Sequence, residues 1–175
     1  FIRLFQNLNI RDGIFEMHVS VGGQELYPYD IACHLTGESS GAIFPEVYGI
    51  NLIDALITYA LTGKMGSVES ILNSSNMSSR KAAQSIWILL SPGKIANISG
   101  IEDIKAQKGV LSCLQRLKKG DEVTDKIFQT EKSTFARLWV CADSRQELKK
   151  IESSIRKRII VKDTQGNSMV WEGEN

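Results

Sequence analysis

Several features of secreted and membrane proteins are missing from the sequence. Its longest nearly apolar runs, at 52–61 and 83–90, fall short of the roughly 20 residues that a helix needs to cross a bilayer. No basic and then apolar leader opens the chain, so we expect no secretion signal. The chain has 3 cysteines and no C-x-x-C pair, which argues against a disulfide framework or structural zinc site. These absences favour a cytoplasmic protein with reduced thiols and no membrane partner.

An excess of either charge is also missing. The 21 Lys and Arg are balanced by 20 Asp and Glu, so the net charge of +1 gives no electrostatic reason to expect a nucleic acid partner. Neither G-x-x-x-x-G-K-[ST] nor G-x-G-x-x-G occurs, so no phosphate-binding loop is recognisable. The basic segment 144–160 is interpreted as a solvated helix face, because the whole chain is close to neutral; the alternative is an anion or nucleic-acid site.

The size of the chain limits what it can be. With 175 residues, 42% of them hydrophobic, it can form one compact domain or two small subdomains with a packed core. Phe1, which is not a Met, already belongs to a helical apolar pattern over residues 1–8. We therefore expect a fragment from the C-terminal side of a longer protein.

The first third of the chain predicts a hairpin. Residues 14–21 alternate between apolar and polar side chains, which is typical of a strand with one buried face. Gly22-Gly23 favours a tight turn, and a second alternating strand follows over 25–35, interrupted by Pro28.

A helix is expected after this hairpin. Residues 36–50 are rich in Gly, Ser and Pro and are interpreted as a loop. Asn51 can cap a helix over 52–62, and Gly63 can end it. That helix is apolar nearly all round, so we expect it to be buried.

The remainder predicts a second, mixed region. Capping boxes at Ser99-x-x-Glu102 and Ser144-x-x-Glu147 each predict a helix, the second with Leu148, Ile151 and Ile155 facing inward. Strands are expected at 84–90, 94–98, 110–117, 135–142 and 168–171. The order of elements favours an α+β fold with a mostly antiparallel sheet and packed helices. We divide the chain into an N-terminal region at 1–63, a Ser-rich linker at 64–82 and an α+β subdomain at 83–175.

Two acidic side chains of the hairpin are candidates for metal binding. Glu16 and Asp30 share one face of the sheet only if one extra residue enters the ladder, and Pro28 marks a natural bulge site. Glu16 would then lie opposite Asp30, with Cβ atoms about 5 Å apart. Two carboxylates at that distance suit Mg²⁺, which prefers oxygen ligands. The alternative is that both acids are merely solvated on an exposed sheet.

The order of short motifs adds a resemblance. Residues 8–16, a Gly-containing hairpin and residues 30–37 are similar to the end of the ATP-grasp fold, where a strand carries a metal-binding Glu and Glu-x-Asn-x-Arg-x-x-Gly follows. Residues 48–55 continue the likeness, and Ser-Pro-Gly-Lys at 91–94 and Lys-Gly-Asp at 119–121 follow in the same order. The chain thus resembles the C-terminal part of ATP-grasp carboxylate–amine ligases, including amino-acid ligases.

Site residues follow from that resemblance position by position. Glu16 and Asp30 match the two acidic metal ligands, while His34 matches the family's Arg and is the candidate catalytic residue. Ala32 stands where the family has Asn and has no donor atom, and His34 is a pH-dependent cation where Arg is a permanent one. These departures leave open an altered site, a low-activity enzyme or a lapsed one.

The family also implies a reaction. ATP would phosphorylate a small-molecule carboxylate, and an amine would displace phosphate from the acyl phosphate, with Mg²⁺ or Mn²⁺ neutralising charge. The nucleotide-binding lysines would lie in upstream ATP-grasp subdomains of the same chain, so the fragment alone should be inactive. The alternative is a non-catalytic dimerisation or docking module derived from an ATP-grasp protein, and a homodimer is left open.

Overall fold

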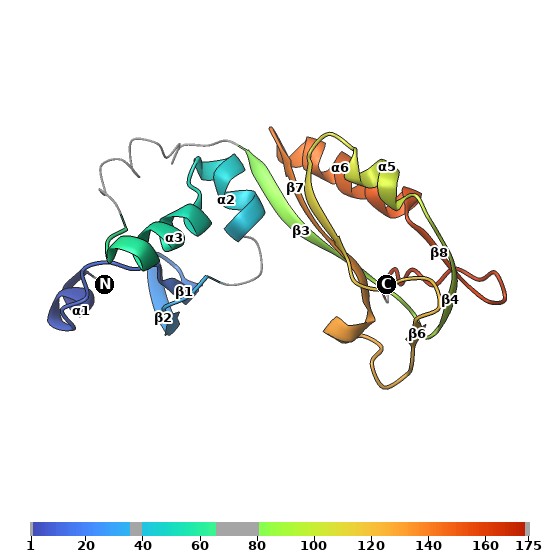
Figure 1. Cartoon of the computed structure of the whole chain (residues 1–175), viewed down its shortest axis with the longest axis horizontal. Helices are drawn as coiled ribbons and strands as arrows, with labels where there is room; N and C mark the ends of the chain where they lie inside the picture. The colour runs from blue at the N-terminus through green and yellow to red at the C-terminus, as the bar shows by residue number, and fades with distance from the viewer. Residues whose placement is uncertain (1, 36–39, 66–80, 174–175) are drawn as a thin grey trace. The chain divides into compact units, whose positions relative to one another are not determined.

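The computed structural model describes residues 2–35, 40–65 and 81–173, drawn in Figure 1. The chain divides into two compact units, Phe1–Ser79 (unit 1) and Arg80–Asn175 (unit 2). Most of the predicted linker 64–82 lies outside the described residues. The fold is α+β, and every strand pair in the described part of the chain is antiparallel, which confirms the predicted class. None of the described helices is long and apolar enough to cross a membrane.

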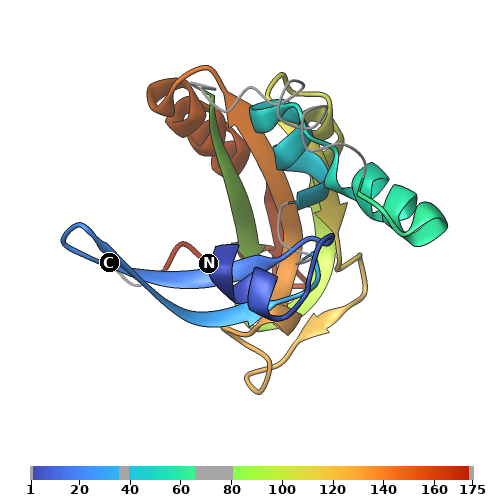
Figure 2. The ribbon, with the colours of Figure 1, turned by 90° about the vertical axis from the view of Figure 1, so that its left-hand side faces the viewer.

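Unit 1 is built around the predicted hairpin. Helix α1 (Ile2–Asn7) precedes strands β1 (Glu16–Gly22) and β2 (Glu25–Ala32), which pair as a two-stranded sheet. Figure 2 shows this pair as a long twisted ribbon. The rings of Phe5 and Phe15 lie 4.6 Å apart, so α1 is held against the start of β1 by an aromatic contact.

The hairpin contains the bulge that the sequence predicted beside Pro28. Val19 pairs with Pro28, and the preceding residue His18 pairs with Asp30, so Tyr29 is the extra residue. Proline has no N–H to give to the ladder, and a bulge is the place in a strand where that loss is tolerated. The bulge reverses which face the following residues of β2 occupy.

Two helices complete unit 1. Helix α2 (Ser40–Tyr48) lies where the sequence predicted a loop, and it packs on α3 (Leu52–Thr62). The loop prediction rested on Gly, Ser and Pro content, yet Ile43, Phe44 and Val47 give the segment an apolar face. Tertiary packing of that face outweighs weak helix propensity, even though Pro45 stands inside the helix.

The ends of α3 are those that the sequence predicted. The side chain of Asn51 accepts hydrogen bonds from the backbone N–H groups of Ile53 and Asp54, at 3.1 and 3.3 Å. Gly63 ends the helix with φ 71°, a left-handed conformation that glycine adopts without the steric cost of a Cβ.

The expectation that α3 is buried is wrong. None of its residues is buried, and Ile53, Ile57 and Leu61 expose 47%, 53% and 80% of their surface. The three follow one another at four-residue spacing, so they form one apolar stripe along the helix. The residues described in unit 1 supply no layer of structure that covers this stripe.

Unit 2 contains two three-stranded sheets. The first has the order β3-β7-β5 and the second the order β6-β4-β8. Their strands are β3 (Ala82–Leu89), β4 (Gly93–Ser99), β5 (Val110–Gln115), β6 (Glu122–Val123), β7 (Thr134–Ala142) and β8 (Ile160–Asp163). Strands β6 and β8 were not predicted, because two and four residues are too short to show alternation.

Two helices cover the first sheet. Helix α6 (Arg145–Arg158) packs on β3 and β7, and α5 (Ile101–Lys105) packs on β5 and beside α6 (Figure 1). Leu148, Ile151 and Ile155 face inward and are buried, as the sequence predicted. They join the strand residues in a continuous apolar core, which makes unit 2 a self-sufficient packed body.

Only one of the two predicted capping boxes forms a cap. The hydroxyl of Ser144 accepts from the backbone N–H of Glu147 at 3.2 Å, as expected. Ser99 is the last residue of β4, and Gly100 stands at the N-cap of α5 with no side-chain bond. A Cβ at Gly100 would lie 2.0 Å from the Arg158 carbonyl oxygen, so the close approach of α6 fixes glycine there.

Candidate functional site

The β1–β2 hairpin brings three of the singled-out polar side chains to one face. Because of the bulge, Glu16 and His18 of β1 share a face with Asp30 of β2. The direct cross-strand partner of Asp30 is His18, and the partner of Glu16 is Ala32. Glu16 and Asp30 are therefore diagonal neighbours, and the predicted direct pairing of the two acids is wrong.

The position of the turn explains this register. Gly22 pairs with Glu25, so the two-residue turn consists of Gly23 and Gln24, whereas the sequence suggested Gly22 and Gly23. Gly23 has φ 64°, which suits the first position of such a turn. Moving the turn along by one residue shifts the pairing by two, which separates the acids without moving them to opposite faces.

The closest contact at this site joins neighbours on one strand. The Nε2 atom of His18 lies 3.1 Å from Oε1 of Glu16, with side chains 48% and 30% exposed. The His18 ring also lies 5.9 Å from that of Tyr29, the bulge residue. The sequence pattern predicts that His18 lies on the face of Glu16, but it gives the imidazole no role. The contact indicates one, because the imidazole holds the Glu16 carboxylate in place.

The candidate catalytic residue stands apart from this contact. His34 is exposed and follows β2, beside residues 36–39, which lie outside the described part of the chain. No hydrogen bond or ion pair joins His34 to Glu16 or Asp30 in the part of the chain that the structure describes. The assignment of His34 as the catalytic residue stays a prediction.

The donor chemistry of the face suits a hard cation in part. Carboxylate oxygens are the ligands that Mg²⁺ and Mn²⁺ prefer, and Mg²⁺ is often held by one or two of them while keeping several waters. No group of three or more His, Cys, Asp or Glu side chains arranged to hold a metal occurs among the described residues. Glu16 and Asp30 can thus supply a partial site, and Ala32 adds no donor to it.

Unit 2 holds a second cluster, in which an arginine stacks on two tryptophans. The guanidinium of Arg137 lies over the rings of Trp87 and Trp139, at 4.3 and 5.0 Å from their centroids, and donates to Ser85 Oγ at 3.3 Å. Trp139 is only 8% exposed, which agrees with a core position. This stacking accounts for the buried arginine as part of the packing of β3 on β7.

Comparison with known proteins shows which fold this is. No protein-family model and no curated protein sequence matches the chain. Two solved structures are similar over 91% of it: an L-amino acid ligase from Bacillus licheniformis, with a TM-score of 0.72 and 16% identity, and a phosphoribosylglycinamide synthetase from Anaerococcus prevotii, with 0.75 and 12%. The chain spans 40% and 39% of their lengths. It therefore has the fold of one part of an ATP-grasp ligase, as the order of its sequence motifs predicted.

Proposed function

We propose that this chain supplies the metal-binding hairpin and the last α+β domain of an ATP-dependent carboxylate–amine ligase. The proposal rests most of all on the shared face of Glu16 and Asp30, because Mg²⁺ bound to a nucleotide is usually held by one or two carboxylates. The likeness to an amino-acid ligase and a phosphoribosylglycinamide synthetase supports the reaction class.

The surface of unit 1 supports the idea that it is completed by further subdomains. Val47 is the one buried hydrophobic residue among those described in unit 1, and about half of the large apolar side chains described there are exposed. Large exposed apolar areas mark interaction surfaces. The exposed set in unit 1 comprises Leu4, Leu8, Val19, Val21, Leu26, Tyr27, Tyr29, Ile31, Tyr48, Ile53, Ile57, Tyr59 and Leu61. Only Leu114 and Ile160 belong to such a set in the described part of unit 2.

The proposed reaction has two steps. An oxygen of the substrate carboxylate attacks the γ-phosphorus of ATP, and the bond from that phosphorus to the bridging oxygen breaks. ADP departs, and the substrate becomes an acyl phosphate. The amine nitrogen then attacks the acyl carbon, phosphate leaves, and the nitrogen loses a proton to form the amide. A bound Mg²⁺ would neutralise phosphate charge in the first step. Glu16 and Asp30 would hold that ion, and His34 would contact a phosphate oxygen.

Calorimetric titration of the 175-residue chain with Mn²⁺ tests the hairpin without requiring activity. We expect Glu16→Gln and Asp30→Asn each to weaken Mn²⁺ binding at least about tenfold, since each removes a charged oxygen ligand. Glu25→Gln is the matched control, because Glu25 has the same charge and lies on β2 at the far end of the hairpin. Equal binding by all three variants and the parent chain would refute the metal site.

A second readout addresses the ligase itself. In a longer protein that contains this chain, Glu16→Gln should abolish ADP release in the presence of carboxylate and amine, and Glu25→Gln should leave it unchanged. Loss of Mn²⁺ binding without any loss of ADP release would separate a metal-binding hairpin from a catalytic one.

The alternative function is a non-catalytic docking or dimerisation module. One observation favours it: Ala32 lies directly opposite Glu16 and offers no ligand where the family has Asn. On this hypothesis the apolar surface of unit 1 serves only association, and Mn²⁺ binding is weak and indifferent to Glu16→Gln.

A further inference from the structure

The two units carry opposite charge, which the near-neutral chain conceals. Unit 1 has three Lys and Arg against eight Asp and Glu, and unit 2 has eighteen against twelve, so their net charges are −5 and +6. Much of the positive charge lies on one element. The 14 residues of α6 include six cations and two acids, a net charge of +4.

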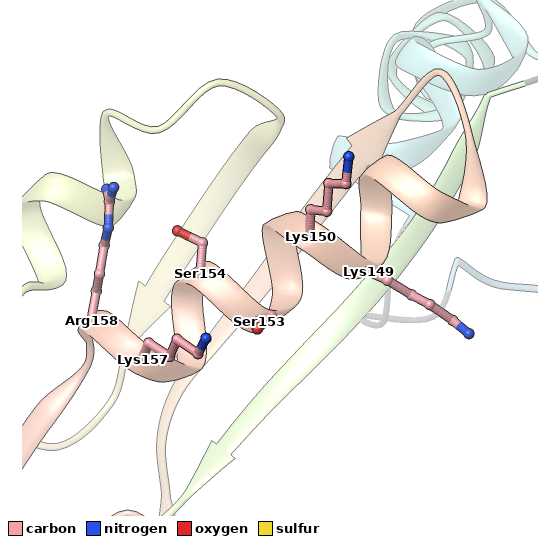
Figure 3. A pocket seen from close by; sticks show the side chains of 6 residues that line it. All are labelled: Lys149, Lys150, Ser153, Ser154, Lys157 and Arg158. Atoms are coloured by element: carbon pink, nitrogen blue, oxygen red, sulfur yellow. The ribbon is translucent and has the colours of Figure 1, made fainter.

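Four of the six cations of α6 lie on its outer half, where Lys149 and Lys150 point to different sides of the helix (Figure 3). A shallow hollow of about 500 Å³ runs along this half, and only α6 lines it (Figure 3). We call this surface the basic stripe, and it consists of Lys149, Lys150, Ser153, Ser154, Lys157 and Arg158. With a rise of about 1.5 Å per residue, the stripe is roughly 13 Å long and has two cations at each end with two hydroxyls between.

Two acids near the stripe are engaged, whereas Glu147 of α6 has no ion-pair partner among the described residues. Glu152 pairs with Arg156 at 3.1 Å, away from the lining residues, and Glu102 on the neighbouring α5 pairs with Lys105 at 2.7 Å. The four cations of the stripe have no ion-pair partner in the part of the chain that the structure describes. Their charge is therefore available to an external anion.

Helix stability explains only part of this pattern. Cations in the last turn interact favourably with the helix dipole, which accounts for Lys157 and Arg158. The effect is confined to the last turn, so it gives no reason for Lys149 and Lys150 in the first half of the helix. A ligand that extends along the helix accounts for both pairs.

We propose that the basic stripe of α6 binds the phosphate backbone of a nucleic acid strand. Arg, Lys and Ser side chains are typical phosphate contacts, and closely spaced phosphates can engage both ends of the stripe at once. This inference replaces the expectation drawn from the net charge, because the charge that matters is local. It is independent of the proposed ligation.

The absence of apolar residues from the stripe indicates which class of partner it binds. Leu148, Ile151 and Ile155 are all buried beneath the helix, and none of the six lining residues is apolar. A protein interface usually has an apolar centre with aromatic anchors, and a membrane-surface helix needs an exposed apolar face. A purely charged and hydroxylated surface fits a polymer of phosphates best.

Fluorescence anisotropy of a labelled 20-nucleotide oligothymidylate with the full chain tests the proposal. Four contacts to a single strand predict a slope of log K against log salt of roughly −2.8, or about 50-fold weaker binding between 50 and 200 mM salt. The triple variant Lys150→Gln/Lys157→Gln/Arg158→Gln retains one contact, so its slope should fall to roughly −0.7. Replacing only Lys150 and Lys157 by arginine keeps both positive charges and should preserve binding.

A matched variant tests whether binding depends on the basic stripe or only on the total positive charge of unit 2. Lys94→Gln/Lys118→Gln/Lys119→Gln removes three exposed cations from elsewhere in unit 2 and should leave the slope near that of the parent chain. An equal loss in both triple variants would overturn the proposal. So would equally tight binding of an oligoglutamate of the same charge, which would indicate an acidic protein partner, or binding to anionic lipid vesicles but not to the oligonucleotide.

Discussion

Ala32 is the direct cross-strand partner of Glu16, on the face that also carries His18 and Asp30. The Cβ atoms of two directly opposed residues lie about 5 Å apart, so a longer side chain at position 32 would extend beside Glu16. The carboxylate of Glu16 is held on the other side by His18 Nε2 at 3.1 Å. The face thus offers two carboxylates and, at Ala32, a gap where a third oxygen ligand can be supplied.

Ala32→Asn is therefore expected to strengthen metal binding. The amide oxygen would add a ligand beside Glu16, and affinity for hard cations rises with the number of oxygen ligands, here on the order of tenfold. Mn²⁺ titration of the 175-residue chain measures the change. Ala32→Leu is the control for altered packing, and the hypothesis fails if Leu and Asn change the affinity equally.

The exposed stripe on α3 predicts an unusual response to substitution. Leu61→Ser should change the free energy of unfolding by less than about 0.5 kcal/mol, because Leu61 is 80% exposed. The same substitution should reduce self-association of the chain, which sedimentation velocity measures. In unit 2, Ile86→Ala should cost about 2–5 kcal/mol, because Ile86 is 1% exposed. A large loss of stability in Leu61→Ser would mean that α3 is covered after all.

The difference between these two sites shows where sequence patterns succeed and fail. The nearly continuous apolar run of β3 and the apolar spacing of α6 predict burial correctly, because the layers that bury them belong to the same unit. The apolar pattern of α3 predicts burial equally strongly, yet the described residues of unit 1 supply no layer that covers it. A hydrophobic pattern states that a face needs a partner, and it does not state where that partner is.

The candidate site shows a similar division. Alternation and Pro28 predicted the bulge and hence the shared face of Glu16 and Asp30, because both depend on local geometry. The direct pairing of the acids depended on which residues form the turn, and the two possible turns, Gly22-Gly23 and Gly23-Gln24, differ little in propensity. One residue in the turn moves every pair of the ladder, so the register was beyond what composition can decide.

The two capping boxes predict contrasting effects of the same substitution. Ser144→Ala should destabilise unit 2 by about 1 kcal/mol, since it leaves the backbone N–H of Glu147 without its partner. Ser99→Ala should cost less than about 0.5 kcal/mol, because Ser99 ends a strand and caps nothing. All three tryptophans lie in unit 2, so denaturant titration followed by tryptophan fluorescence reports on this unit directly. Equal costs for the two variants would contradict the observed cap geometry.

A turn in unit 2 makes a defined contribution to acid stability. Desolvation raises the pKa of the Asp163 carboxyl, but hydrogen bonds from Asn167 and Gln165 outweigh it, so the pKa lies below its usual 3.8. The backbone N–H groups of Gln165 and Asn167 donate to Oδ1 at 2.8 and 2.9 Å, and the Asn167 amide donates to Oδ2 at 3.1 Å. Each of these bonds favours the ionised form.

The pH dependence of stability follows from the sign of that shift. A carboxyl with a lowered pKa in the folded state stabilises the protein above its unfolded pKa, about 3.9, and this contribution disappears as the pH falls through the folded value. Asp163→Asn should therefore be less stable than the parent chain at pH 7, and the two should converge as the pH drops below about 4. Urea titrations between pH 7 and 3, followed by tryptophan fluorescence, measure the difference. A gap that stays constant or widens in acid would show that the turn does not depend on the charge of Asp163.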